Sequence, residues 1–367
     1  MKSEEKALRF FLGANTPQGF VSRFDHLSDK TDGFRILIIK GGPGSGKSTM
    51  IKKIAEEFGD EKTERIYCAS DFGSLDGAIF HNRRLAIADG TRPHVIEPKY
   101  PGAVESLIDV TPCWNEDALF QCRDDIKALT KSCSMCHEQS CRFLSAAASL
   151  LGDTYRLSLA AVNTPKLSAY AERLCERELK SKDRQRPYGY EKVRFFSAVT
   201  NKGVSVFTDT AKLLCDRIYL VNDDYGAVSR ILLTSTRAAA LAAGHDVISC
   251  YCPLSPYEKL EHLFIPKLSL GFVTSSRFHD FNNDIDAYRI VNCQRFSDPA
   301  KLKECKKRVN FNRKAAMQMT EKAAELLREA KKLHDELESY YIAATDFKKV
   351  DALTEKVMDK IRKYPQY

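Results

Sequence analysis

The residues with the most specific chemistry lie between Gly41 and Thr49, where the sequence is Gly-Gly-Pro-Gly-Ser-Gly-Lys-Ser-Thr. Its spacing fits G-x-x-x-x-G-K-[ST], the pattern of a loop that binds phosphate groups. Residues without a Cβ let several backbone amides converge on one anion. We expect Lys47 to reach the β- and γ-phosphate oxygens of a nucleotide and the Ser48 hydroxyl to ligate Mg²⁺. The predicted nucleotide-binding residues are Gly41, Gly42, Pro43, Gly44, Ser45, Gly46, Lys47, Ser48 and Thr49.

The sequence on both sides of this loop supplies the elements that such a site needs. Residues 36–39 form a continuous apolar run, as a strand buried on both faces should. After the loop, apolar residues recur with helical spacing up to Phe58, and Gly59 follows as a stop signal. A helix that begins near Lys47 places the positive end of its dipole beneath the phosphates. This context favours a phosphate site over a glycine-rich surface loop that binds nothing.

The sequence repeats itself with an offset of about 183 residues. The matching segments are 9–11 with 194–196, 35–39 with 217–221, 67–68 with 251–252, 91–94 with 276–279 and 160–163 with 343–346. A polar stretch that ends in Pro187 and Gly189 is the predicted linker. We therefore predict two tandem domains, residues 1–183 and 190–367.

Each predicted domain alternates strands with helices and then becomes helical. This order indicates an α/β fold with a mostly parallel sheet and a long helical tail. The tails are expected at residues 114–175 and 298–361, where they pack on the sheets or on each other. Each unit begins with a short segment that forms a hairpin, in the first half around Pro17-Gln18-Gly19.

The second copy lacks the phosphate-loop residues. Without a gap, residues 41–48 align with residues 223–230, so that Lys47 faces Ser229. Asp223 and Asp224 then stand where phosphate oxygens would lie, which is repulsive at ordinary pH. We therefore expect one nucleotide per chain, bound in the first half.

The inactive copy serves as an internal control for the acidic candidates. Asp89 ends an apolar run at the place of a magnesium-coordinating acid, and its counterpart is uncharged, which favours a metal role over an ordinary turn. Asp71 also lacks an acidic counterpart. It is a candidate to orient an attacking water or a substrate hydroxyl, and a helix-cap or turn role is equally open.

Two basic residues complete the candidate set. Arg92 could stabilise charge on a γ-phosphate. Yet both Arg92 and His94 have counterparts in the second copy, Arg277 and His279, which favours a structural role. We also expect Arg230 to approach the phosphate site of the other unit.

Composition bounds the remaining possibilities. At 367 residues the chain exceeds one ordinary core, and 43% hydrophobic with 29% charged residues is typical of globular proteins. No apolar run approaches the roughly 18–20 residues of a membrane span, and the charged start lacks a signal-peptide core, so a cytoplasmic location is expected. The net charge of +8 suits phosphate ligands and does not favour nucleic acid over other partners.

Twelve cysteines raise the question of a metal or redox site. The tightest cluster is Cys133-x-x-Cys136-His137, followed by Cys141. A metal site competes with a plainer interpretation, in which small apolar thiols line one helix face, and both stay open.

Several motifs resemble a bacterial family of tandem phosphate-loop proteins. They are residues 13–20, 40–48, 68–71, 89–94 and 98–104. Members are usually called ATP-binding proteins or nucleotide kinases, without an assigned substrate. The resemblance covers nearly the whole chain and implies an ATP-binding P-loop NTPase fold. Many members carry a working loop in both halves, and this chain departs from them in the second.

Three functional hypotheses follow. The first is an ATPase in which residues 41–49 bind MgATP, Asp89 supports the metal, and the second half transmits or receives a conformational change. The second is a small-molecule or nucleotide kinase, for which Arg123, Arg184 and Arg186 are candidate lid residues. The third is an ATP-gated binding or regulatory module with little turnover.

Overall fold

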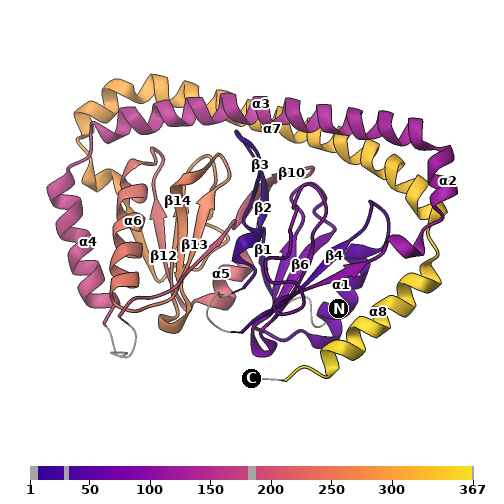
Figure 1. Cartoon of the computed structure of the whole chain (residues 1–367). Helices are drawn as coiled ribbons and strands as arrows, with labels where there is room; N and C mark the ends of the chain where they lie inside the picture. The colour runs from indigo at the N-terminus through magenta and orange to yellow at the C-terminus, as the bar shows by residue number, and fades with distance from the viewer. Residues whose placement is uncertain (1–6, 29–32, 181–186, 366–367) are drawn as a thin grey trace.

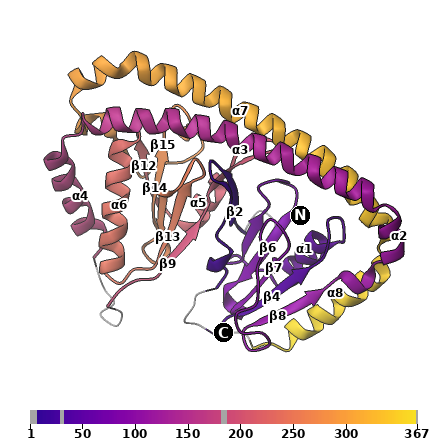
Figure 2. The same ribbon diagram turned by 45° about the horizontal axis from the view of Figure 1, so that its top comes forward.

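The computed structural model describes residues 7–28, 33–180 and 187–365. It contains two six-stranded sheets, one from each half of the sequence, and two long helices that run side by side across both (Figures 1 and 2). Most strand pairs in each sheet are parallel, and helices cover the sheets. The chain is therefore of the α/β class, as the sequence predicts.

The first sheet has the order β1-β5-β6-β7-β4-β8. Its strands are β1 (Leu8–Phe10), β5 (Glu64–Tyr67), β6 (Leu75–Phe80), β7 (Leu85–Asp89), β4 (Arg35–Lys40) and β8 (Glu105–Asp109). Only β6 runs antiparallel to its neighbours. The sequence analysis does not predict β6, because both of its faces are buried and its side chains do not alternate. Gly77 is required there, since a Cβ would lie 2.8 Å from the Ile87 carbonyl oxygen.

The second sheet repeats the same order of equivalent strands. Read from its other edge it is β9 (Glu191–Arg194), β13 (Val247–Cys252), β14 (Ser255–Ile265), β15 (Leu270–Ser275), β12 (Arg217–Asn222) and β16 (Arg289–Asn292). Its strand directions also match those of the first sheet. One sequence pairing is corrected: β1 and β9 place Phe10 opposite Ile66 and Arg194 opposite Cys250, so that Arg194 corresponds to Phe10 and not to Arg9.

Two hairpins and one short helix lie between the sheets (Figure 1). They are β2 (Gly13–Thr16) with β3 (Gly19–Ser22), β10 (Ser197–Thr200) with β11 (Gly203–Val206), and α5 (Thr208–Leu214). The hairpin expected around Pro17 is thus confirmed. Equivalent backbones meet here, because Phe11 and Phe195 exchange both N–H···O bonds, at 3.0 and 2.9 Å. Beside them the buried Arg194 donates to the buried Glu64 at 2.7 Å, and one apolar cluster includes residues of both halves.

The remaining helices follow the expected helical segments. On the sheets lie α1 (Lys47–Phe58) and α6 (Ala227–Ala242), and the tails are α2 (Glu116–Gln121), α3 (Arg123–Leu159), α4 (Thr164–Glu178), α7 (Pro299–Ala344) and α8 (Phe347–Arg362). Short 3-10 helices occupy Phe24–His26, His81–Arg83, Thr111–Cys113, Pro266–Leu268 and Cys293–Phe296. Asn and Asp side chains cap the tail helices, as at Asn163 and Asp346. Among the described residues, no helix combines the length and the apolar composition that crossing a bilayer requires.

The two helical tails are exchanged between the halves. Helix α4 of the first half packs on the second sheet, where Leu167 and Leu174 join the apolar cluster around Phe272. Helix α8 of the second half packs on the first sheet, where Val357 and Ile361 join the cluster around α1. The predicted boundary between residues 183 and 190 separates the two sheets, but each tail buries its apolar face against the other half. The division into the domains 1–183 and 190–367 therefore stays a prediction.

Each helical tail crosses from its own half to the other, and equivalent backbone hydrogen bonds hold the chain at the two places where this happens. The Asp346 amide donates to the Cys113 carbonyl at 2.9 Å, and the equivalent Asn163 amide donates to Phe296 at 2.7 Å. The antiparallel pair α3 and α7 passes over the interface between these points, with alanines such as Ala147 and Ala323 fully buried in the contact. The C-terminal end of α7, which belongs to the second half, therefore lies at the first sheet.

Candidate functional site

The residues predicted to bind nucleotide form a loop between β4 and α1. Gly44 and Gly46 adopt positive φ angles of 67° and 84°, which glycine tolerates without strain. Gly46 is the N-cap of α1, and Lys47, Ser48 and Thr49 open the helix. The Ser45 hydroxyl donates to the Gly42 carbonyl at 2.8 Å and closes the turn. We call residues 41–47 the glycine loop.

Lys47 lies inside the glycine loop and faces Asp89. Its ammonium donates to the carbonyls of Gly41 at 3.1 Å and Gly42 at 2.5 Å, and it lies 3.5 Å from Asp89 Oδ2. Strand β7 runs parallel to β4 with Asp89 level with Ile39, and this register carries the carboxylate to the loop. The other Asp89 oxygen accepts bonds from the amide and the hydroxyl of Thr91. The structure thus brings together a lysine and an acid that are 42 residues apart in sequence.

Ser48, the residue after Lys47 in α1, offers a second oxygen. Its hydroxyl oxygen accepts a bond from the Leu75 amide at 2.9 Å, which leaves one lone pair and the hydroxyl proton. A hydroxyl and a carboxylate are hard oxygen ligands of the kind that Mg²⁺ prefers. Ser48 and Asp89 therefore fit a magnesium ion that accompanies a nucleotide.

Asp71 has the contacts of a turn residue. Its carboxylate accepts bonds from the Gly73 amide at 3.2 Å and the Ser74 hydroxyl at 2.8 Å, and it lies 3.4 Å from Lys331 Nζ of α7. Burial alone would raise its pKa, but the bond from Ser74 and the charge of Lys331 hold it below the usual value. Within the described ranges it makes no hydrogen bond or ion pair with the glycine loop.

Among the described residues, none of the basic candidates makes a hydrogen bond or an ion pair with the glycine loop. Arg92 is exposed and has no hydrogen bond or ion pair in the part of the chain that the structure describes. Arg123 is exposed at the start of α3 and stacks on Phe120. Arg184 and Arg186 lie outside the described residues. The expectation for Arg230 is wrong: it pairs with Glu258 at 3.0 Å and stacks on Tyr155, both beside the second sheet.

The end of α7 covers the glycine loop. The Gly44 amide donates to Glu338 Oε1 at 3.1 Å. A Cβ at position 42 would lie 2.6 Å from a ring carbon of Tyr341, and one at position 44 would lie 2.8 Å from the Glu338 carbonyl oxygen. Glycine at these positions therefore also permits the close approach of α7. The Gly44 amide, which the sequence predicts to bind phosphate, thus donates to a carboxylate. The sequence pattern does not predict this contact with Glu338.

Glu338 belongs to a chain of titratable groups between α7 and α3. Its Oε1 lies 3.4 Å from His334 Nε2. The Cys133 thiol and Glu338 raise the pKa of His334 to about 9. Burial would raise the pKa of Cys133, but hydrogen bonds with His137 and His334 lower it to about 6. The lowered pKa favours the thiolate form of Cys133, which lies two side chains away from the glycine loop.

The predicted cysteine cluster does not form a ligand group. Among the described residues, Cys133, Cys136, His137 and Cys141 do not place three ligand atoms close enough to share an ion. Burial raises the pKa of both Cys136 and Cys141, so these two behave as ordinary half-buried thiols.

The second loop, residues 223–227, is filled by a side chain of its own, that of Asp223. Asp223 is buried, and its carboxylate accepts bonds from the amides of Tyr225, Gly226 and Ser229 at 3.0, 2.9 and 2.8 Å. Gly226 caps α6 at φ 82°, as Gly46 caps α1. The second loop is therefore two residues shorter, and Ala227, not Ser229, takes the place of Lys47. A fixed carboxylate replaces the anion that the glycine loop would bind.

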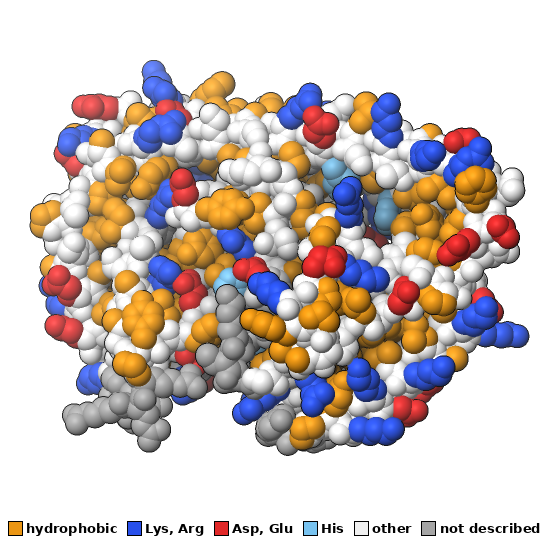
Figure 3. Space-filling view, viewed as in Figure 1, with side chains coloured by type: hydrophobic (Ala, Val, Ile, Leu, Met, Phe, Trp, Pro, Cys, Tyr) orange, Lys and Arg blue, Asp and Glu red, His pale blue; other side chains and the backbone are white. Residues whose placement is uncertain are grey.

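The hollows on the molecule differ between the halves. A cavity of about 440 Å³ lies against the second loop, between α3, α7 and the β13–β14 hairpin, with Arg156, Arg230 and Arg313 on its wall. Figure 3 shows a hollow beneath the long helices on the side of the first sheet, with histidine and charged side chains at its edge. Over the same face, positive and negative side chains are interspersed.

Comparisons of the chain with family models, with curated proteins and with solved structures find no match. The second half of the same chain offers an internal comparison for the first. It has kept the strand order and the caps, and it has lost Lys47, Asp89 and the longer loop.

Proposed function

We propose that the chain is a P-loop NTPase that binds MgATP at the glycine loop and hydrolyses it, while the second half is a pseudo-NTPase unit. The observation that carries the proposal is the placement of Lys47 inside the glycine loop, 3.5 Å from Asp89 at the end of the adjacent parallel strand. Lysine, acid and amide-rich loop are the parts that phosphoryl-transfer sites of this type require.

The residues present fit the nucleotide in three respects. The Gly44 amide already donates to a carboxylate, which stands in for a phosphate oxygen. The Lys47 ammonium holds two loop carbonyls, and phosphate oxygens would replace these acceptors. Ser48 and Asp89 would hold the magnesium ion, which when bound neutralises charge on the β- and γ-phosphates.

The covering helix supports a coupling between binding and shape. Glu338 must leave the Gly44 amide before a phosphate oxygen can accept its bond. Glu338 lies on α7, which continues into α8 and begins in the second half. A nucleotide therefore binds better to a state in which the end of α7 has moved, and it shifts the chain toward that state. This feature also favours a second candidate, an ATP-gated module with the same site and little turnover.

A measurement of phosphate release from MgATP distinguishes these functions. Wild-type protein with MgATP alone is expected to release phosphate, and Lys47→Ala is expected to abolish release. Lys53→Ala is the matched control, because Lys53 lies on the same helix and makes an exposed pair with Asp351, which contributes little. Binding without release supports the gated module, and release or transfer only with an added metabolite supports a small-molecule or nucleotide kinase. Equal release by wild type and Lys47→Ala contradicts the proposal.

A further inference from the structure

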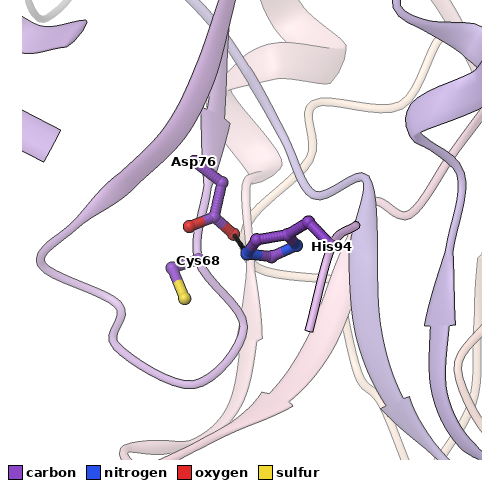
Figure 4. A group of neighbouring side chains, drawn as sticks. All are labelled: Cys68, Asp76 and His94. Carbon is purple, nitrogen blue, oxygen red and sulfur yellow. Dashed lines mark ion pairs between the residues drawn. The ribbon is translucent and has the colours of Figure 1, made fainter. Parts of the chain in front are cut away.

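Three potential metal ligands converge at the same edge of the first sheet, outside the glycine loop. Cys68 follows β5, Asp76 lies in β6, and His94 follows β7. One ligand atom from each lies within 4.8 Å of the other two, and Figure 4 shows Asp76 and His94 facing each other with Cys68 beside them. Asp76 and His94 are 5% and 6% exposed, and Cys68 is half-buried. The antiparallel β6 brings Asp76 between the other two.

The buried pair in this cluster lacks the bonds that it needs. His94 Nε2 lies 3.2 Å from Asp76 Oδ2, but neither Asp76 Oδ2 nor His94 Nδ1 has a hydrogen-bond partner among the described residues. Unsatisfied groups at such depth are rare and costly. Two ligands on one tetrahedral zinc ion, with bonds of about 2.0–2.1 Å, stand about 3.3 Å apart. The observed separation thus suits two ligands of one ion.

The second half contains an equivalent cluster, in which a lysine ammonium lies beside the thiol and the carboxylate. Strand pairing places Glu261 at the position of Asp76, and Cys252 and His279 correspond to Cys68 and His94. Lys259 takes the position of Ser74, and its ammonium lies 2.7 Å from Glu261 Oε1 and 3.8 Å from Cys252 Sγ. Burial alone would lower the pKa of Lys259, but Cys252 and Glu261 raise it. Here the thiol and the carboxylate share a permanent positive charge.

The first half has no such lysine. Ser74 stands at that position, and its hydroxyl donates to Asp71 instead. We propose that Cys68, Asp76 and His94 bind a divalent transition-metal ion of the zinc type in the place that the Lys259 ammonium fills in the second half. One sulfur, one imidazole nitrogen and one carboxylate oxygen form a ligand set for zinc, and they leave one tetrahedral position for water or a substrate atom.

The Cys68 thiol does not have the environment of a cysteine nucleophile. Burial and the charge of Asp76 raise the pKa of Cys68 well above its usual value, whereas nucleophilic cysteines have a lowered pKa. A bound ion takes the thiolate form, so the thiol proton is released on binding. The Leu75 amide, next to Asp76, donates to Ser48, so the metal would lie beside the glycine loop without needing a nucleotide.

The test uses Co²⁺ as a spectroscopic probe on the whole chain after chelator treatment, with no nucleotide present. We expect one metal ion per chain and a sulfur-to-cobalt charge-transfer band. Cys68→Ser is expected to remove the band and to weaken binding roughly 100-fold or more, beyond what loss of a supporting residue costs. Cys252→Ser is the matched control and is expected to leave both unchanged.

Ser74→Lys adds a discriminating variant. It places in the first half the ammonium that the second half uses, so we expect it to abolish cobalt binding while the thermal unfolding midpoint stays close to wild type. No charge-transfer band in wild type contradicts the proposal and leaves a plain Asp76–His94 ion pair. Equal cobalt affinity in wild type, Cys68→Ser and Ser74→Lys contradicts it as well. These outcomes are independent of nucleotide binding, so they are distinct from failure of the proposed function.

Discussion

The Glu338 carboxylate accepts a hydrogen bond from the Gly44 amide across 294 residues of sequence, at 3.1 Å. In the second loop the carboxylate of Asp223 accepts three amide bonds in the same way. The two loops differ in where the carboxylate comes from. Asp223 belongs to the loop that it fills, whereas Glu338 belongs to α7, which is far from the glycine loop in the sequence. The first loop therefore opens only if the end of α7 moves away, and the second loop has no such separate cover.

Glu338→Gln is expected to tighten nucleotide binding. The variant removes a negative charge that competes with phosphate for the Gly44 amide, and Glu338 is partly exposed, so we expect an effect of roughly 3–10-fold in Kd, below the full strength of a charged hydrogen bond. Titration with a fluorescent ATP analogue measures it. Glu336→Gln, on the exposed side of the same helix, is the control. An unchanged Kd in Glu338→Gln would show that α7 does not compete.

Asp89→Asn is expected to abolish the magnesium dependence of ATP binding, measured as the ratio of Kd values with Mg²⁺ and with EDTA. It also leaves the buried Lys47 without its charged partner, which should cost roughly 1–3 kcal/mol of unfolding free energy. The control is Asp109→Asn. Asp109 accepts the same pair of bonds from Thr111 as Asp89 does from Thr91, but it ends β8 and makes no ion pair with a lysine within residues 7–28, 33–180 and 187–365. Equal ratios in both variants would remove Asp89 from the metal site.

The alkylation rate of Cys133 is expected to follow a titration with a midpoint at about pH 6. Its pKa is lowered on folding, so the stability that the thiolate contributes is present above its unfolded pKa of about 9 and is lost as the pH falls through about 6. His334→Gln removes one of the two histidines and should move the midpoint upward. Peptide mapping after iodoacetamide treatment measures the rate, with Cys136 as the internal ordinary thiol. A midpoint near 9 in wild type would contradict the contact between Cys133 and His334.

The exchanged tails predict that neither half folds alone. Residues 1–183 lack α8, and their own α4 would expose the apolar face that it buries on the second sheet. We expect the isolated fragment to show no cooperative unfolding, and co-expression with residues 187–367 to restore it. Circular dichroism on heating measures both. A cooperative transition in the 1–183 fragment alone would show that the tail can fold back on its own sheet.

Local features of this fold were predictable from sequence. The run at residues 36–39, the glycines from 41 to 46 and the periodic residues up to Phe58 each act within one or two turns of chain, so the strand, loop and helix follow from them. The tail helices follow for the same reason, and the duplication follows from the matching segments themselves. Strand β6 was missed because burial on both faces removes the alternation that marks a strand.

Long-range relationships were not predictable. Nothing near Glu338 marks it as the partner of Gly44, because helical periodicity says which face is apolar and not which loop lies beneath it. The tail exchange depends on crossings such as Asp346 with Cys113, which have no local signature. The sequence alignment of Lys47 with Ser229 is wrong because the second loop is two residues shorter. Only the position of Gly226 as the N-cap of α6 shows this gap. The approach of Asp89 to Lys47 follows from the register of two adjacent parallel strands, and its role toward a metal ion stays a prediction.

Calorimetric titration of the whole chain with MgATP measures directly whether the glycine loop binds a nucleotide. We expect one nucleotide per chain, bound at Lys47, with no measurable binding by Lys47→Ala and unchanged binding by Lys53→Ala. Two nucleotides per chain, or wild-type affinity in Lys47→Ala, would contradict it.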